Sequence, residues 1–205
     1  METQLFLSTD PQALRLALEI LQGGGLVAFP TDTVYGLGAL VQIPECIQTL
    51  YSVKGREATK AIPLLLSNPD EMEQVALVIS PMARRLAERF WPGPLTLVVP
   101  KHPSLPVELS SLSTVGVRMP NHPVALALLR VTGPLAVSSA NRSGEASTVT
   151  AHEVVEHLGG RIALVLDGGR TPGGMSSTVV DCTGDTPVIL RQGPISIVEL
   201  QQALS

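Results

Sequence analysis

Hydrophobic and polar positions divide the chain into short segments of two alternating kinds. Seven segments are compatible with helices, and proline stands at the start of four of them, at 11, 69, 81 and 123. Proline suits the first helical turn because its φ is preset and its missing N–H is not needed there. Capping-box patterns begin three segments, at Asn68/Glu71, Thr150/Glu153 and Ser196/Glu199. We therefore expect helices over 11–22, 44–53, 69–76, 81–90, 123–131, 151–158 and 197–204.

Short apolar runs rich in Val, Leu and Ile separate these segments, and their length and β-branched content favour strands. The expected strands are 26–29, 63–66, 95–99, 115–117, 135–137, 162–166, 178–180 and 188–190. Interleaved strands and helices predict an α/β fold around a twisted sheet with flanking helices. The hairpin-like spacing of the last two strands indicates a mixed sheet. Because no linker, repeat or low-complexity tract divides the chain, we expect a single domain over 1–205.

Composition supports an ordinary globular protein. Of the 205 residues, 44% are hydrophobic and 16% charged, so disorder is not expected, and the 3% share of aromatics leaves the core to aliphatic residues. The net charge of -4 argues against a dedicated nucleic-acid-binding protein, which would carry a broad basic surface. This overall charge is still compatible with a local basic pocket for phosphates.

The cysteines and the N-terminus indicate where the protein works. Cys46 and Cys182 lie far apart without metal-ligand spacing, so we expect two buried, reduced thiols. The first residues lack the basic and apolar regions of a secretory signal, and no apolar run approaches the ~20 residues of a membrane span. The expected location is the cytoplasm.

Five polar or glycine-rich segments stand at the ends of apolar strands, where α/β folds present ligand-binding loops. They cover residues 30–38, 54–56, 117–120, 138–144 and 167–177. Taken singly, each also has a purely structural interpretation: the first is an ordinary turn, and Lys54 and Arg56 complement a helix dipole. Ser139 and Asn141 would share one face of an extended segment, but an ordinary turn would also use Ser, Asn and Gly. Arg118 is either a carboxylate ligand or a surface residue.

Several familiar chemistries are missing from the sequence. No Walker-type P-loop occurs, so a bound nucleotide must be held differently. There is no Ser-His-Asp set, and the four histidines lie in proline-rich or helical contexts that favour capping or surface roles. No protein side chains are expected to hold a metal ion.

The order of the motifs is more specific than any one of them. Lys54-x-Arg56 followed by Ser139-x-Asn141 resembles the paired signature of the YrdC/Sua5 family. Similar family blocks occur at 30–37, 117–123, 177–181 and 190–193. The resemblance covers the chain from about Gly25 to Gly193. The sequence departs from the family pattern at Glu57 and at Ala61-Ile62, where relatives carry prolines, and Leu65 replaces a residue that is often polar.

The resemblance implies a YrdC-like α/β fold with a large, positively lined concave cavity. It also implies the activity of a nucleotidyltransferase that converts L-threonine, bicarbonate and ATP to threonylcarbamoyl-AMP and pyrophosphate. Mg²⁺ would enter with the ATP. Other proteins would then transfer the threonylcarbamoyl group to adenosine 37 of tRNA, with contact between this chain and RNA as a further expectation. The end of the chain at Ser205 resembles the short, single-domain form.

The roles of individual residues follow from the same resemblance. The expected catalytic residues are Lys54 and Arg56. Threonine would bind to Thr33, Arg118, Ser139 and Ser177. ATP would bind to Arg56, Lys60, Thr114, Asn141, Ser147 and Arg191. These cations would stabilise charge that develops as pyrophosphate leaves.

Two alternatives stay open. One is a related carbamoyl-adenylating activity, such as that of the YrdC-like module in hydrogenase maturation proteins. The other is a non-catalytic YrdC-like protein that holds an RNA backbone in the basic concavity. Threonine-independent ATP consumption would favour the first, and salt-dependent RNA binding without ATP turnover the second.

Overall fold

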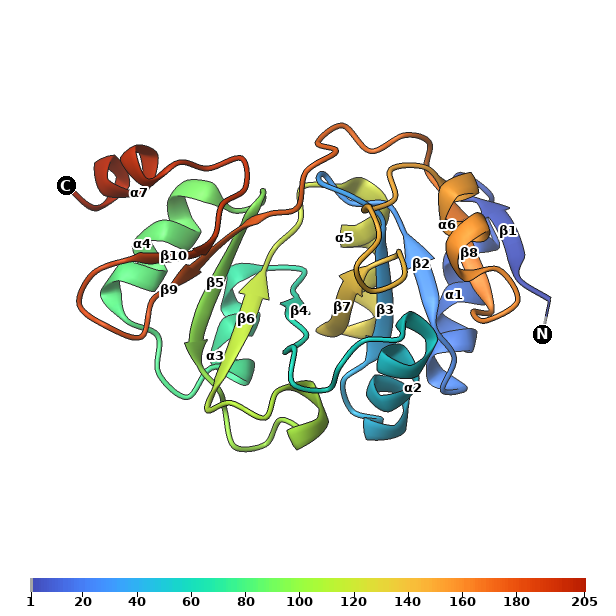
Figure 1. Cartoon of the computed structure of the whole chain (residues 1–205), viewed down its shortest axis with the longest axis horizontal. Coiled ribbons are helices and arrows are strands. Elements are labelled where there is room, and N and C mark those ends of the chain that lie inside the picture. Colours follow the sequence, from blue (N-terminus) through green and yellow to red (C-terminus); the bar gives the residue numbers. More distant parts are fainter. Residues whose placement is uncertain (1) are drawn as a thin grey trace.

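Ten strands hydrogen-bond side by side into one continuous sheet in the computed structural model, which describes residues 2–205 (Figure 1). The strands are β1 (Gln4–Leu7), β2 (Val27–Phe29), β3 (Gly36–Leu40), β4 (Leu64–Leu65), β5 (Leu95–Pro100), β6 (Thr114–Arg118), β7 (Leu135–Ser139), β8 (Leu164–Asp167), β9 (Thr178–Asp181) and β10 (Val188–Arg191). Their spatial order is β1-β8-β2-β3-β7-β4-β6-β5-β9-β10. Parallel and antiparallel pairs both occur, and β9 and β10 form an antiparallel pair. The predicted α/β fold with a mixed sheet is confirmed.

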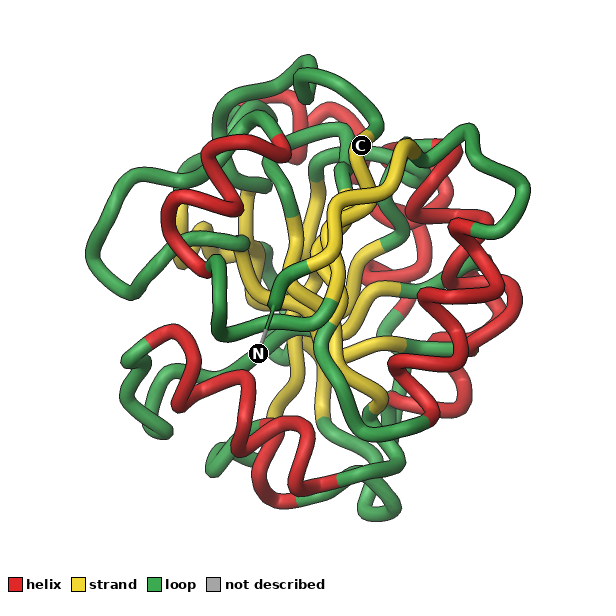
Figure 2. The backbone as a smooth tube through the Cα atoms, turned by 90° about the vertical axis from the view of Figure 1, so that its right-hand side faces the viewer, coloured by secondary structure: helices red, strands yellow, loops and turns green. Residues whose placement is uncertain are grey.

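Helices lie on both sides of the strands (Figure 2). They are α1 (Ala13–Gln22), α2 (Pro44–Lys54), α3 (Met72–Val75), α4 (Pro81–Phe90), α5 (Pro123–Thr132), α6 (Ala151–Leu158) and α7 (Ile197–Leu204), with short 3-10 helices at Pro69–Glu71 and Val107–Leu109. All seven predicted helical segments are present, within two residues at most ends. Between residues 2 and 205, no helix combines the length and apolar character that crossing a bilayer requires.

The predicted caps form with one systematic difference. Ser196 and Glu199 make the full capping box at the start of α7. At the other two sites the cap side chain accepts the expected backbone N–H, but the acidic partner turns to the preceding residue. Glu71 accepts from the backbone N–H of Ser67 at 2.7 Å, and Glu153 from that of Val149 at 2.6 Å.

Two strands, β1 and β3, were not predicted from the sequence. The prediction of a continuous loop over 30–38 is wrong at its end, because β3 begins at Gly36 and pairs with both β2 and β7. A Cβ on Gly36 would lie 2.7 Å from Val137 Cγ1, and one on Gly38 would lie 2.8 Å from Phe29 Cε1. The glycines that suggested a loop are therefore needed for close packing inside the sheet.

The core divides into two clusters of aliphatic side chains. One lies between α1, α5 and alternate residues of strands β2, β7 and β8. The other joins α2, α3, α4, α6 and α7 to the remaining residues of those strands and to the strands beyond them. Strand residues alternate between faces, so Leu97, Val115 and Val117 enter the second cluster. Both cysteines, Cys46 and Cys182, are buried and free, as predicted.

Candidate ligand cavity

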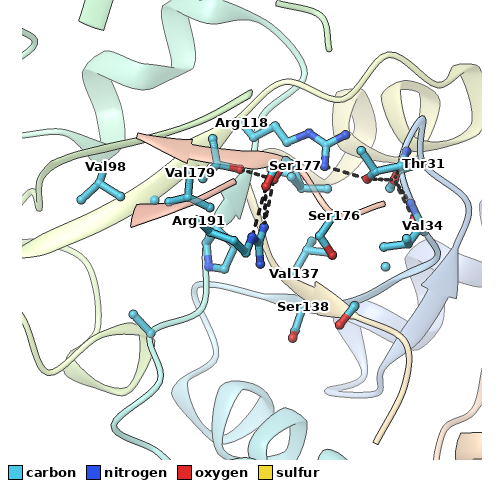
Figure 3. Close-up of a pocket in the computed structure, with 18 of the residues that line it drawn as sticks. Thr31, Val34, Val98, Arg118, Val137, Ser138, Ser176, Ser177, Val179 and Arg191 are labelled. Atoms are coloured by element: carbon cyan, nitrogen blue, oxygen red, sulfur yellow. Dashed lines mark hydrogen bonds between the residues drawn. The ribbon is translucent and has the colours of Figure 1, made fainter. Parts of the chain in front are cut away.

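A cavity of about 320 Å³ opens on one face of the sheet, where the same alternation exposes the other set of side chains. Thr96 and Val98 on β5, Thr114, Gly116 and Arg118 on β6, and Val137 and Ser139 on β7 all line it. The remaining walls come from loops around residues 31–36, 56–63 and 176–177 and from the end of β10. Segments from nearly the whole chain therefore meet at this cavity (Figure 3).

Buried threonine hydroxyls organise one end of the cavity. Thr31 Oγ1 donates to the carbonyl oxygen of Val34 at 2.7 Å, so its contact with Thr33 Oγ1 at 2.9 Å must use the proton of Thr33. Arg118 Nη1 donates to Thr33 Oγ1 at 2.9 Å. The proton of the Thr33 hydroxyl is thus already used in a hydrogen bond within the protein, and its oxygen can only accept a hydrogen bond from a ligand.

Arg118 is held rigidly at the same end. Its Nε donates to the carbonyl oxygen of Gly93 at 2.9 Å, and its Nη2 pairs with Asp32 Oδ1 at 2.5 Å. Burial lowers the pKa of Arg118, and the neighbouring Asp32 carboxylate partly offsets that effect. Guanidinium has five N–H donors, and these three contacts leave two for a ligand carboxylate.

A second hydrogen-bonded group lies across the cavity, on β5, on the residue just before β9 and on β10. Thr96 Oγ1 and Ser177 Oγ are 2.8 Å apart, and Arg191 donates to the carbonyl oxygen of Ser177 at 3.0 and 3.1 Å and to its hydroxyl at 3.2 Å. Figure 3 shows Arg191 beside Ser177 with these bonds drawn. Thr96 was not found in the sequence, and its alternation with Val98 on an apolar strand was the available signal.

Arg56 reaches the cavity from the end of α2. Its Nε and Nη2 donate to the carbonyl oxygens of Lys60 and Ala61, both at 3.1 Å. Partial removal from water lowers the pKa of Arg56, and the pKa of Arg191 falls for the same reason and because Arg56 is near. Within residues 2–205, neither arginine forms an ion pair with a carboxylate.

An apolar surface completes the cavity. It is formed by Ala61, Pro63, Leu65, Val98, Leu112, Val137, Val179 and Leu190. Gly116 keeps part of the floor open, since a Cβ there would meet Thr96 Cγ2 at 3.1 Å and Pro63 Cβ at 3.2 Å. Cations, hydroxyls and an apolar wall in one cavity suit a ligand that combines phosphates with a flat, apolar ring.

Seven of the predicted site residues line this cavity, namely Thr33, Arg56, Thr114, Arg118, Ser139, Ser177 and Arg191. Four others stand outside its wall. Lys60 is exposed and lies 3.4 Å from Glu57, and Ser147 is half-buried in the loop before α6. Lys54 and Asn141 are buried beside the cavity, where Lys54 Nζ donates to backbone carbonyl oxygens and Asn141 Nδ2 to those of Arg142 and Glu145.

Comparison with known proteins places this cavity in a family. The Sua5/YciO/YrdC family profile, described by the words "Telomere recombination", matches residues 19–193. A threonylcarbamoyl-AMP synthase of Pyrococcus abyssi is 42% identical over 93% of this chain, which spans 57% of that relative's length. A putative threonylcarbamoyl-AMP synthase of Mycobacterium tuberculosis (strain H37Rv) is 40% identical over 98% of this chain and 95% of its own.

A solved structure of a relative also places the chain in this family. That of P. abyssi Sua5 complexed with L-threonine superposes with a TM-score of 0.91 at 41% identity, over 93% of this chain and 57% of that one. The resemblance of the Lys54-x-Arg56 and Ser139-x-Asn141 pair is thereby confirmed across nearly the full sequence. The chain belongs to the Sua5/YciO/YrdC family.

Proposed function

We propose that this chain is an enzyme that forms threonylcarbamoyl-AMP and pyrophosphate from L-threonine, bicarbonate and ATP. Its relatives in P. abyssi and Bacillus subtilis are named threonylcarbamoyl-AMP synthases, at 42% and 40% identity. The structure with L-threonine has the same fold. The cavity offers a binding partner for each part of the two larger substrates.

The observation that carries this proposal is the pair Arg56 and Arg191. Both guanidinium groups line one cavity, and neither has a carboxylate partner among residues 2–205. Cations partly removed from water are costly unless an anion joins them. The triphosphate of ATP would supply that anion, and the apolar wall would receive the adenine ring.

The Thr33 and Arg118 end suits an amino acid. Free donors on Arg118 match a carboxylate, and the acceptor on Thr33 matches an ammonium or hydroxyl donor of L-threonine. Ser139 and Ser177 lie on the same cavity wall. This arrangement would hold the amino group toward the phosphates.

The reaction needs positioning and charge stabilisation. The amino nitrogen bonds to bicarbonate carbon with loss of water, and a carbamate oxygen then bonds to the α-phosphorus as the bond to the β-phosphate oxygen breaks. Arg56 and Arg191 would stabilise negative charge on the departing pyrophosphate. Holding both substrates in one cavity makes the encounter effectively intramolecular.

Mg²⁺ is expected to arrive with ATP, whose phosphate oxygens would hold it and share its charge. Cations and hydroxyls line the cavity, and the carboxylate of Asp32, between the lining residues Thr31 and Thr33, is engaged by Arg118. This set of side chains fits an ion carried by the nucleotide. The product would pass to proteins that modify tRNA, and we place this step in the cytoplasm in a single domain over residues 1–205.

Pyrophosphate release tests the proposal directly. Purified protein is incubated with Mg-ATP, bicarbonate and L-threonine, and release is measured with each substrate omitted in turn. Release that requires all three is the expected result. Threonine-independent release would favour another carbamoyl-adenylating activity, and RNA binding without release would favour the non-catalytic alternative.

Arg56→Ala and Arg191→Ala sharpen the test. Each removes a charge-assisted contact to phosphate, so we expect kcat/KM for ATP to fall by roughly 10- to 100-fold. Arg15→Ala is the matched control, because Arg15 is exposed on α1 and, among residues 2–205, pairs only with Glu19. Wild-type kinetics in either cavity variant, with its fold intact, would remove that residue from the site.

A further inference from the structure

Lys54 stands at the end of α2 and holds the segment that follows β7. Its Nζ donates to the carbonyl oxygens of Ser139 and Asn141. Its own carbonyl oxygen accepts from the backbone N–H of Ser143 at 2.8 Å. One residue therefore fixes the segment 139–143 at three points.

The helix end separates Lys54 from the other cation of the motif. Gly55 has a φ of 59°, in the left-handed region, and the N–H of Arg56 returns to the carbonyl oxygen of Tyr51 at 2.9 Å. The chain reverses between the two cations. Lys54 is buried, with 2% of its surface exposed, whereas Arg56 is half-buried and lines the cavity.

The Lys54 ammonium has no carboxylate partner within residues 2–205, so its charge is balanced by carbonyl dipoles alone. Burying the Lys54 ammonium lowers the free energy of unfolding. Water could satisfy the carbonyl oxygens of a surface loop without that cost, so this burial calls for a functional reason. The segment that it fixes contains one residue of the cavity wall and one buried residue behind that wall. Ser139 lines the cavity, and Asn141 Oδ1 is a buried acceptor for which the described residues provide no donor.

We propose that Lys54 is a positioning residue, which acts on the ligands through Ser139 and Asn141 and does not touch the β- or γ-phosphate. The sequence-based prediction of Lys54 as a catalytic residue is replaced by this role. The two cations of Lys54-x-Arg56 then divide their work, since the first holds the protein and the second holds the nucleotide. This inference rests on the proposed function for the identity of the nucleotide.

The phosphate chain distinguishes a positioning residue from a direct ligand. If a cation contacts the β- or γ-phosphate, its removal weakens the affinity of the protein for ATP more than the affinity for AMP. If a residue only positions Asn141, its removal weakens the affinity for ATP, ADP and AMP by the same factor. Lys54→Met keeps the aliphatic stem and removes the donors, and Arg56→Ala serves as the direct-contact reference.

The experiment measures dissociation constants of ATP, ADP and AMP by calorimetry, without threonine, for wild type, Lys54→Met, Asn141→Ala and the double variant. We expect Lys54→Met to weaken all three nucleotides by a similar factor of about 10, equivalent to a lost hydrogen bond. In the Asn141→Ala background the same change should cost little more, because interacting residues are not additive. Losses that grow with phosphate number, or that multiply fully in the double variant, would overturn the proposal.

Two controls keep the result interpretable. Ser52→Ala alters the same helix at an exposed residue whose hydroxyl contacts only the Gln48 carbonyl oxygen, and it should bind like wild type. If Lys54→Met does not fold, Lys54→Gln retains N–H donors without the charge. A positioning role then predicts a mild loss that is equal for the three nucleotides, and a loss that grows with phosphate number contradicts it.

Failure of the proposed function looks different. A wild-type protein that binds nucleotides but releases no threonine-dependent pyrophosphate refutes the function, while the comparison of Lys54 variants can still be read from binding. An active wild type with phosphate-dependent Lys54 losses refutes only the positioning role.

Discussion

At the residue scale, the ligands that the cavity can bind depend on which hydrogen-bond donors and acceptors are already used within the protein. Thr33 gives its proton to Thr31 and accepts from Arg118, and Arg118 divides three donors among Gly93, Thr33 and Asp32. The motif suggested which residue types meet a ligand. Only the structure shows which of their hydrogen-bonding sites remain for it.

Thr33→Val tests that accounting with almost no change of shape. The variant removes the acceptor for Arg118 and for the substrate, so the KM for threonine should rise about 10-fold, while the KM for ATP stays near its wild-type value. Steady-state kinetics with each substrate varied provides the measurement. Thr49→Val, at an exposed site on α2, is the control, and an equal rise for both substrates would contradict a threonine-specific contact.

The burial of Lys54 predicts that the free energy of unfolding depends on pH. Burial, followed by the nearby Arg56 charge, lowers the pKa of Lys54 from 10.5 to about 8. Between these values the unfolded chain binds more protons than the folded one, so the free energy of unfolding gains from this group as pH rises. The gain is about 1.4 kcal/mol for each unit of difference in pKa.

Urea unfolding of wild type and Lys54→Met from pH 7.5 to 10.5 isolates this contribution, since the other titrating groups are common to both proteins. We expect the wild type to gain stability relative to the variant across that interval. A constant difference would show that the Lys54 ammonium keeps its ordinary pKa in the folded protein.

At the scale of elements, local signals were sufficient for the helices and weaker for the sheet. Proline and capping residues mark helix starts independently of the rest of the fold, and α4, α5, α6 and α7 begin where they indicate. Strand β3 could not be found this way. Gly36 is required by Val137, which is distant in sequence, and Gly38 by Phe29 on the adjacent strand β2. This signal therefore exists only after the strands have paired.

Gly193 shows the same dependence at the end of β10. A Cβ there would lie 2.3 Å from the backbone nitrogen of Thr178 and 2.5 Å from the carbonyl oxygen of Ser176. Backbone atoms cannot rotate away, so Gly193→Ala should lower the free energy of unfolding by about 1–3 kcal/mol and weaken pyrophosphate binding by displacing Ser177. Gly184→Ala, in open space, should leave both unchanged. Thermal unfolding and calorimetry test this, and a variant as stable as wild type would contradict it.

At the scale of the whole molecule, the site is assembled from segments that are far apart in the sequence, from Thr31 to Arg191. The family motifs identified seven wall residues, but they do not include Thr96 and do not show that Lys54 and Asn141 lie behind the wall. Those placements follow from strand order, which brings β5 beside β9 and β3 beside β7. Pairing of distant strands is not encoded in any local pattern.

Because α2 and β10 both contribute arginines, an anion should stabilise the entire fold. We expect pyrophosphate to raise the melting temperature of wild type, with about 1.4 kcal/mol gained for each tenfold excess over its dissociation constant. The shift should shrink in Arg56→Ala and Arg191→Ala and persist in Arg15→Ala. Differential scanning fluorimetry measures it, and identical shifts in all four proteins would place the anion elsewhere.

The position of Arg191 on the last strand also sets an order of events during synthesis. Thr31, Arg56 and Arg118 leave the ribosome well before β10, which supplies the second unpaired guanidinium. Until then the nascent chain holds only part of its anion site, and the helices and strands already released must fold without help from the nucleotide. The chain therefore becomes competent to bind the anion only after β10 has been translated and has paired with β9.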